Sequence, residues 1–395
     1  MQIGEHDQAP AVHPLWRLAF RAGFLCAALF AVLSMLRWLN WMLSPQSWHS
    51  AVSPNWWHAH EMVFGFAMPV VAGFLLTAVA NWTGTAGTRG IRLQWLFGLW
   101  LTARLVLWLT PELKLLAWAA EMAFICLLGW ELTTRVWPRR QWRNMLFTPL
   151  LLVLMALDTA SFLQWDNTLL TTQLHYGAVW MITAFIVIIG GRVTPLFTAN
   201  RLGLKIAPLP NGFEYSCIAI TVVIGLRIAL LPSTGSSPVW TALFLLGAAM
   251  HSYRLWHWQG WKTGAEPLLW SMHLAYLCIP LSMLLLALAG NDLIAIKNAT
   301  HLLAIGTIGG MILAMMSRVT LGHTGRQLAV PVFMAIAFAT VFCAALVRAL
   351  LPQLAPQATA IAWEISAVLW IVAFALFLWH FAPMLYRARV DGKPG

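Results

Sequence analysis

Residues 301–320 read HLLAIGTIGGMILAMMSRVT, and residues 175–194 read HYGAVWMITAFIVIIGGRVT. In each stretch a histidine, His175 or His301, is followed 17 residues later by Arg-Val-Thr, and the two copies are offset by 126 residues. The residues between are almost all apolar, so each stretch is expected to cross a membrane as a helix. At about 1.5 Å rise per residue, the histidine lies roughly 25 Å from the arginine. The imidazole is therefore expected inside the hydrocarbon, near the face opposite the arginine.

The composition places the whole chain in the membrane. Hydrophobic residues make up 60% of it, charged residues only 9%, and it contains 24 tryptophans. We therefore expect an all-α integral membrane protein forming one polytopic domain over residues 1–395, with a tail over 1–14, twelve transmembrane helices over 15–386 and a tail over 387–395. The expected helices are 15–39, 59–80, 91–110, 113–133, 144–164, 168–191, 212–232, 237–257, 266–289, 295–317, 328–351 and 359–386.

Lysine and arginine gather at alternate ends of these helices, as at Arg139, Arg140 and Arg143. Because basic residues are retained on the cytoplasmic side, both termini are expected to be cytoplasmic. The net charge of +11 is attributed to this asymmetry, so no nucleic-acid partner is expected. The first apolar run is too long for a cleavable signal peptide, and none is expected.

The histidines sort into two layers once the helices are oriented. A buried imidazole needs a partner to offset its desolvation, and metals and haem iron are common partners, although a hydrogen-bonded structural histidine is the alternative at each position. The second, sixth and tenth helices carry outer-layer histidines, and this spacing favours three four-helix units. The outer layer holds His58, His60, His175 and His301, and the cytoplasmic layer holds His251, His273 and His323.

Residues near the outer histidines refine this prediction. His58 and His60 are two positions apart, which on a helix turns them roughly 200° from each other. We expect His60 to face inward from the helix and His58 to lie on the incoming loop, with Met62 as a further soft ligand or a packing residue. Glycines are expected to leave room for a flat macrocycle or to let helices pack closely. They are Gly65, Gly177, Gly306, Gly309 and Gly310.

Ionisable residues within the apolar runs are costly in lipid and are expected to face the protein interior. There they could relay protons, anchor haem propionates or form structural pairs. Arg192 and Arg318 are expected to anchor the cytoplasmic boundary, with a part in the site as the alternative. The ionisable residues within the apolar runs are Arg104, Glu121, Asp158, Glu214 and Glu364.

Several motifs together resemble the NnrS family. They are residues 57–66 (WHAHEMVFGF), 81–84 (NWTG), 190–195 (GGRVTP) and 301–326, the last ending in SRVTLGHTGR. The likeness runs from about residue 14 to residue 326 and departs at Ala80, where the family pattern leads us to expect proline. The resemblance implies a twelve-helix inner-membrane protein of denitrifying and related bacteria that contains haem and copper and takes part in the response to nitric oxide.

A weaker, architectural resemblance is to the catalytic subunit of haem-copper oxidases and nitric oxide reductases. By that analogy His60 and His301 would be the axial ligands of a haem, expected to be haem b, and His175 with His58 would bind copper. The seventh helix has no histidine and the tenth has one where the oxidases have two, so a complete binuclear site is not expected. The secondary ligand candidates are His273, His323, His251, Met62, Arg192 and Arg318.

Together these observations predict a multi-pass protein of the bacterial inner membrane that binds haem and copper and that binds, detoxifies or protects against nitric oxide. Turnover as a nitric-oxide-related oxidoreductase is left open, and the sequence does not identify an electron donor. The alternatives are a secondary transporter, which shares many helices and internal repeats, a metal-handling membrane protein without catalytic activity, and a haem held by the cytoplasmic histidines.

Overall fold

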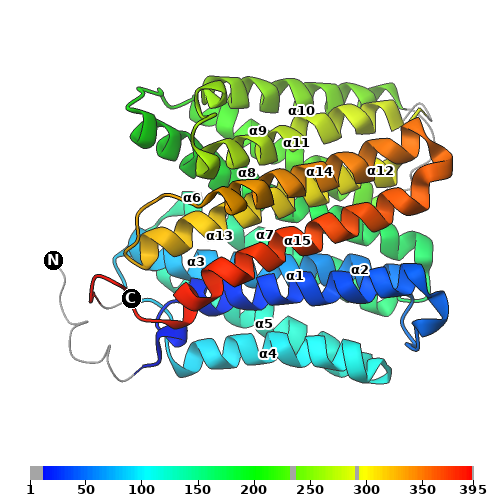
Figure 1. Ribbon diagram of the computed structural model, residues 1–395, viewed down its shortest axis with the longest axis horizontal. Helices are drawn as coiled ribbons and strands as arrows, with labels where there is room; N and C mark the ends of the chain where they lie inside the picture. Colours follow the sequence, from blue (N-terminus) through cyan, green and yellow to red (C-terminus); the bar gives the residue numbers. More distant parts are fainter. Residues whose placement is uncertain (1–11, 232–236, 290–292, 394–395) are drawn as a thin grey trace. The chain divides into compact units, whose positions relative to one another are not determined.

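The computed structural model describes residues 12–231, 237–289 and 293–393, and every regular element within these ranges is a helix (Figure 1). The expected all-α class is therefore confirmed. Parts of both expected tails, residues 1–11 and 394–395, lie outside the described residues, and so do residues 232–236 and 290–292.

Ten helices within the described ranges are long and apolar enough to cross a membrane. The expected spans at 91–110 and 237–257 also fold as helices, α4 and α10, but they are not among the ten. Both carry arginines, such as Arg104 and Arg254, that reduce their apolar character. The count of twelve spans therefore stays a prediction. The ten spans are Ala19–Leu43, Pro54–Thr83, Pro111–Arg139, Trp142–Leu163, Thr168–Leu202, Asn211–Leu230, Pro267–Ala289, Ile296–His323, Val332–Leu354 and Pro356–Tyr386.

Contacts along the chain define two compact units, and each is described here by itself. The first unit comprises Met1–Thr172, Met316–Leu328 and Phe374–Gly395, and the second comprises Gln173–Met315 and Ala329–Ala373. The three four-helix units expected from the histidine spacing stay a prediction.

The first unit contains helices α1 (Ala19–Leu43), α2 (Pro54–His60), η4 (Glu61–Ala67), α3 (Met68–Thr83), α4 (Ile91–Leu109), α5 (Lys114–Val136), α6 (Trp142–Met145) and α7 (Phe147–Leu163). The second contains α9 (Asn211–Leu230), α10 (Pro238–His257), α11 (Pro267–Ala289), α12 (Ile296–His301), η8 (Leu302–Gly309) and α14 (Val332–Leu354). Residues of both units belong to α8 (Thr168–Leu202), α13 (Gly310–His323) and α15 (Thr359–Tyr386). Short 3-10 turns lie at Pro14–Trp16, Pro45–Ser47, Pro111–Leu113, Trp137–Arg139, Gly260–Lys262 and Pro356–Ala358.

Close helix packing in the first unit depends on glycine. Helix α1 packs along α3, and a Cβ on Gly23 would lie 2.5 Å from the Pro69 carbonyl oxygen. A Cβ on Gly73 would lie 3.1 Å from the Phe20 Cα atom. The two backbones can approach this closely because neither glycine has a side chain, as is common between membrane helices.

The segment that carries His60 is one helix with a wide, π-helical turn inside it. Ser53 caps its start by accepting a hydrogen bond from the Trp56 N–H, and Pro54 occupies the first turn, where its missing N–H costs nothing. The π-helical turn η4 follows directly after His60. Pro69 has no N–H to donate to the Gly65 carbonyl, and the Trp100 indole donates to that oxygen instead, at 3.1 Å.

The same segment ends where the sequence departs from the family pattern. Helix α3 runs through Ala80 to Thr83 and stops at Gly84, whose φ of +63° lies in the left-handed region. Glycine adopts this conformation without the steric cost that a side chain carries, so it terminates the helix. Alanine at position 80 therefore leaves a regular helix end.

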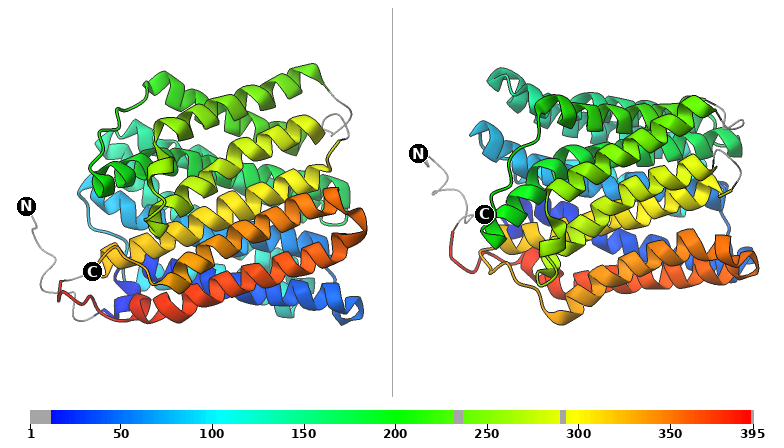
Figure 2. Two further views of the ribbon diagram at one scale, coloured as in Figure 1. Left: turned by 45° about the horizontal axis from the view of Figure 1, so that its top comes forward. Right: turned by 90° about the horizontal axis from the view of Figure 1, so that it is seen from above.

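In the second unit α10 and α11 lie side by side in all three views (Figure 1 and Figure 2), and η8 packs between α11 and α14. The glycines of η8 and of the start of α13 face neighbouring side chains. A Cβ on Gly306 would lie 2.5 Å from the Cys278 sulfur, and one on Gly309 would lie 2.4 Å from the Trp370 ring. Because these glycines have no side chain, Cys278 and Trp370 of neighbouring helices pack directly against the η8 backbone.

Candidate functional site

A buried polar cluster lies inside the first unit. Its five side chains come from five different elements: His60 ends α2, Glu61 begins η4, Arg104 lies in α4, Glu121 in α5 and Asp158 in α7. All five are at most 3% exposed. His60 Nδ1 lies 2.9 Å from Glu61 Oε1, and its Nε2 lies 2.9 Å from Asp158 Oδ1. Arg104 donates to Glu61 Oε1 at 2.8 Å and pairs with Glu121 through its other terminal nitrogen.

The protons of this cluster can be counted from the contacts. Ionised carboxylates only accept hydrogen bonds, and a neutral imidazole donates from one nitrogen only. His60 faces a carboxyl oxygen with each nitrogen. Either His60 is an imidazolium, or one of its two partners, Glu61 and Asp158, is protonated. His60, Glu61 and Asp158 together therefore carry one proton more than a neutral imidazole and two ionised carboxylates would carry.

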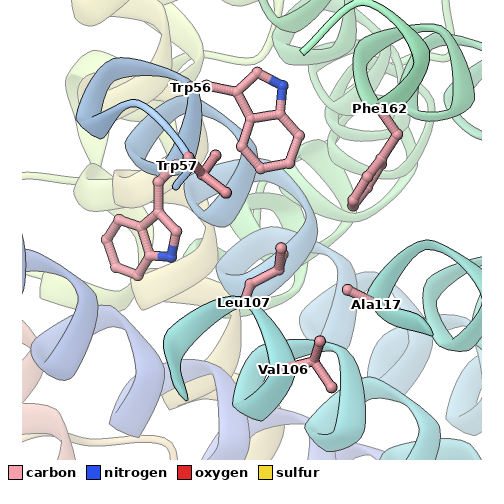
Figure 3. Packing of buried hydrophobic residues seen from close by; sticks show 7 residues of the cluster. Trp56, Trp57, Val106, Leu107, Ala117 and Phe162 are labelled. Carbon is pink, nitrogen blue, oxygen red and sulfur yellow. The ribbon is translucent and has the colours of Figure 1, made fainter. Parts of the chain in front are cut away.

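A buried apolar cluster, which Figure 3 shows around Trp56, Trp57, Leu107 and Phe162, adjoins the polar cluster at Trp56. The Trp56 ring stacks on His60 with ring centroids 4.5 Å apart, and its indole donates to the Ser161 carbonyl at 3.2 Å. Arg37 packs over the rings of Trp48, Trp57 and Trp108 and interacts electrostatically with Glu61. Excluding water in this way strengthens the charge interactions and makes each unpaired charge costly.

The two other ligand candidates of this segment, His58 and Met62, contact residues outside the polar cluster. His58 lies within α2, so the expectation that it sits on the incoming loop is wrong, because Ser53 and Pro54 start the helix earlier than the apolar pattern indicates. Its ring stacks on Trp38 with centroids 4.1 Å apart. The Met62 sulfur accepts a hydrogen bond from the Ser34 hydroxyl at 3.7 Å.

In the second unit His301 has a defined orientation. It ends α12, directly before the π-helical turn η8, just as His60 ends α2 before η4. Its Nδ1 donates to the Lys297 carbonyl at 2.7 Å, which leaves the lone pair of the neutral ring on Nε2. Metal-binding histidines commonly have their other nitrogen bound in this way. His175 is 2% exposed and lies within the regular helix α8.

The room that the glycines were expected to leave for a macrocycle is filled by protein atoms. A Cβ on Gly65 would lie 2.2 Å from the Phe30 ring, and one on Gly177 would lie 2.5 Å from the Ala229 Cβ. A Cβ on Gly310 would lie 2.9 Å from the Phe342 ring. Together with Gly306 and Gly309, these positions serve helix packing, the alternative that the sequence left open.

The cytoplasmic-layer candidate His251 belongs to a hydrogen-bonded chain in the second unit. Thr221 donates to the Cys217 carbonyl, so it accepts from His251 Nε2 at 3.1 Å. His251 Nδ1 then accepts from the Tyr276 hydroxyl at 2.7 Å, and that hydroxyl accepts from Arg254, also at 2.7 Å. Because both ring nitrogens are used, His251 has no nitrogen for a metal in this arrangement.

The same chain continues to a carboxylate. Arg254 is held by Glu214 through two nitrogens and by the Val187 carbonyl at 3.0 Å. A Cβ on Gly191 would overlap the Arg254 guanidinium, so glycine is needed beside it. Structural pairing, one of the alternatives for Glu214, is therefore what the structure contains. The part of Tyr276 could not be predicted, since nothing in its sequence neighbourhood marks it.

The remaining candidates have separate surroundings. His273 Nε2 donates to the Thr198 hydroxyl at 2.9 Å in the second unit. In the first unit His323 contacts the Phe20 ring, and its carbonyl accepts from Arg389 at 2.8 Å. Arg389 also binds Asp391 and thereby lowers the pKa of that carboxyl.

Arg192 and Arg318 are half-buried, each at the end of its repeat. The threonines that close the two repeats, Thr194 and Thr320, are both fully buried.

The site residues thus fall into separate groups within each unit. Among the described residues, no set of three or more histidine, cysteine, aspartate or glutamate side chains is arranged to hold a metal ion. The residue most easily missed is Glu61, which was visible only as one letter of the motif at 57–66. The sequence signal for Glu61 is a carboxylate that directly follows a histidine within an apolar run. Such a carboxylate needs a buried cation as its partner, and Arg104 is one.

The comparison with curated proteins gives no match. The comparison with protein families matches the family described as NnrS protein over residues 14–389, which is nearly the whole chain. The match extends beyond residue 326 and includes the last two helices. This many-helix membrane protein belongs to the NnrS family.

Proposed function

We propose that this protein acts in the bacterial inner membrane as a haem- and copper-binding protein that binds nitric oxide and detoxifies it or protects against it. Family membership supports the proposal. So does the repeated arrangement in which His60 and His301 each end an α-helix and a π-helical turn follows. Such turns are rare and occur frequently at functional sites.

In this proposal His301 is a haem ligand. The Lys297 carbonyl fixes its tautomer, so Nε2 carries the lone pair that iron requires. The donor therefore fits the group. The macrocycle would not lie over Gly306 or Gly309, because Cys278 and Trp370 fill those positions. Haem with one histidine ligand and an open iron position supplies a binding site for nitric oxide, whereas ligation by two histidines favours electron transfer.

In the alternative with two histidine ligands, which favours electron transfer over direct nitric oxide binding, His60 would be the second ligand under one condition. Its Nε2 lies against Asp158, so ligation requires that this hydrogen bond break and that the proton on the pair leave. Glu61 on Nδ1 would then orient the ring, as carboxylates do beside metal-bound histidines. Copper is proposed at His175 with His58, since imidazole nitrogen suits that metal.

The experiment uses the full chain purified in detergent from cells supplied with haem and copper. We expect a Soret band that shifts on addition of nitric oxide, and copper by elemental analysis. His301→Ala should remove haem. His175→Ala should remove copper. The matched control is His257→Ala, whose Nε2 binds the Ala207 carbonyl and whose ring stacks on Tyr253. Wild-type protein without either cofactor would refute the proposal, and unchanged haem in both His60→Ala and His301→Ala would refute the ligand assignment.

A proton-coupled secondary transporter is the second candidate, and the cluster of His60, Glu61 and Asp158 is the observation that favours it. Buried carboxylate and histidine groups that share a proton are typical of proton relays in transporters. Such a protein is colourless when purified. A preparation that lacks the Soret band but acidifies vesicles in a manner that Asp158→Asn abolishes would favour this function.

A further inference from the structure

Arg348 is a buried cation in the second unit. It lies in α14, is 8% exposed, and donates to the Asn298 side-chain oxygen at 3.1 Å. Its guanidinium lies 4.7 Å from the centre of the Trp363 ring. An amide oxygen and an indole ring are neutral partners, so they do not compensate its charge. A buried cation without a counter-ion is strongly unfavourable.

A second cation faces the same ring. The Lys297 ammonium lies 5.2 Å from the centre of Trp363. Lys297 and Asn298 are neighbours in α12, and the Lys297 carbonyl accepts the hydrogen bond from His301. The phenol of Tyr176, the residue after His175, interacts electrostatically with Arg348. Two positive charges therefore lie beside the Trp363 ring, and both are tied to α12, the helix that ends at His301.

The carboxylates that the structure describes in the second unit do not compensate these charges. Glu214 pairs with Arg254, and Glu266 pairs with Arg201. Glu364 follows Trp363 in the chain, but no ion pair joins it to Arg348 or Lys297 within the described residues. Asp292 lies outside those residues, and the experiment below tests it directly.

We propose that Arg348, with Lys297, binds a carboxylate or small oxyanion beside His301. Guanidinium presents planar, forked donors that match a carboxylate or nitrite group, and the ammonium adds a point charge. In protein loaded with haem the anion is a propionate of that haem. In haem-free protein it is a free oxyanion such as nitrite. Only the first of these rests on the proposed haem.

The first arm of the test uses haem-free full-length protein in detergent, with sodium nitrite and sodium acetate as probes in calorimetric titrations. We expect saturable binding that Arg348→Gln weakens at least about tenfold, as loss of a charge-assisted hydrogen bond does. Arg348→Lys should retain part of the affinity. Arg227→Gln is the control, because that arginine also packs on a tryptophan, Trp240, at 5.0 Å.

The second arm uses haem-loaded protein and measures transfer of haem to an acceptor protein. Arg348→Gln should speed haem loss at least about tenfold and shift the propionate bending bands in the resonance Raman spectrum. If the wild type holds no haem, the proposed function fails while the nitrite arm still decides this inference. Absence of nitrite and acetate binding together with unchanged haem retention in Arg348→Gln would overturn it.

Asp292 provides the remaining outcome. If it is the counter-ion, Asp292→Asn and Arg348→Gln should destabilise the protein equally and non-additively. Nitrite affinity should then appear only in Asp292→Asn, and this result would overturn the proposal. If Asp292→Asn leaves the affinity of the wild type for nitrite unchanged, the anion site stands as proposed.

Discussion

Replacing Arg104 by methionine should strongly destabilise the first unit. The change keeps most of the apolar stem but removes the cation that joins Glu61 and Glu121, both of which are buried. Removing one partner of a buried ion pair typically costs about 3–5 kcal/mol, because the other charge is left uncompensated. We expect this cost for Arg104→Met, which corresponds to a change of roughly 10²- to 10⁴-fold in the folding equilibrium.

The assay is reversible unfolding in mixed micelles, with the fraction of denaturing detergent varied and tryptophan fluorescence recorded. Arg92→Met is the matched control, since Arg92 is 68% exposed and lies 3.5 Å from Glu131. Glu131 is buried but keeps Arg135 and Thr88 as partners, so losing the exposed Arg92 should cost at most about 1 kcal/mol. The triple variant Arg104→Met/Glu61→Gln/Glu121→Gln should recover at least half of the loss, since no buried charge is then left unpaired.

The reasoning fails if Arg104→Met is no less stable than Arg92→Met. It also fails if the triple variant is as unstable as Arg104→Met alone. The first result would mean that the cluster is solvated or already neutral. The second would mean that the shape of the arginine, and not its charge, is what the packing requires.

Three further changes test other parts of the structure. Gly306→Ala brings a Cβ to 2.5 Å from the Cys278 sulfur; it should cost about 1–3 kcal/mol in the same unfolding assay, and Cys278→Ala should relieve part of this cost. Tyr276→Phe removes a buried hydroxyl that forms two hydrogen bonds. The free energy of unfolding should fall by about 1–3 kcal/mol, and an unchanged value would contradict the hydrogen-bonded chain. Arg389 lowers the pKa of Asp391. Their pairing therefore stabilises the tail at every pH above the ordinary pKa of an aspartate, and the stabilisation is lost only as the pH falls through the lowered pKa. Protease susceptibility of the tail should stay constant from about pH 8 to pH 5, whereas Asp391→Asn should raise it throughout.

Much of the fold could be predicted from the local sequence. Apolar runs of helical length predicted the all-α membrane class, and the repeat of His175 and His301 marked two helices that the structure contains. Residue chemistry also indicated that Arg104 and Asp158 are interior, because the lipid gives an ionised side chain no partner. The limits of the helices were less predictable. Apolar periodicity missed the start of α2, which a serine cap and Pro54 determine.

The partners of the buried side chains required the tertiary structure. His60 meets Asp158 98 residues away, and Arg348 meets Asn298 50 residues away. A sequence pattern reports which face of one helix is polar, but the choice of neighbour depends on how several helices pack. The glycines illustrate this difference, since the sequence allowed either a macrocycle or close packing, and side chains from distant helices fill the space. The sequence alone therefore determined that polar groups are buried in this protein. Only the folded chain determined which charges and hydrogen-bonding atoms compensate one another, because that depends on distances in three dimensions.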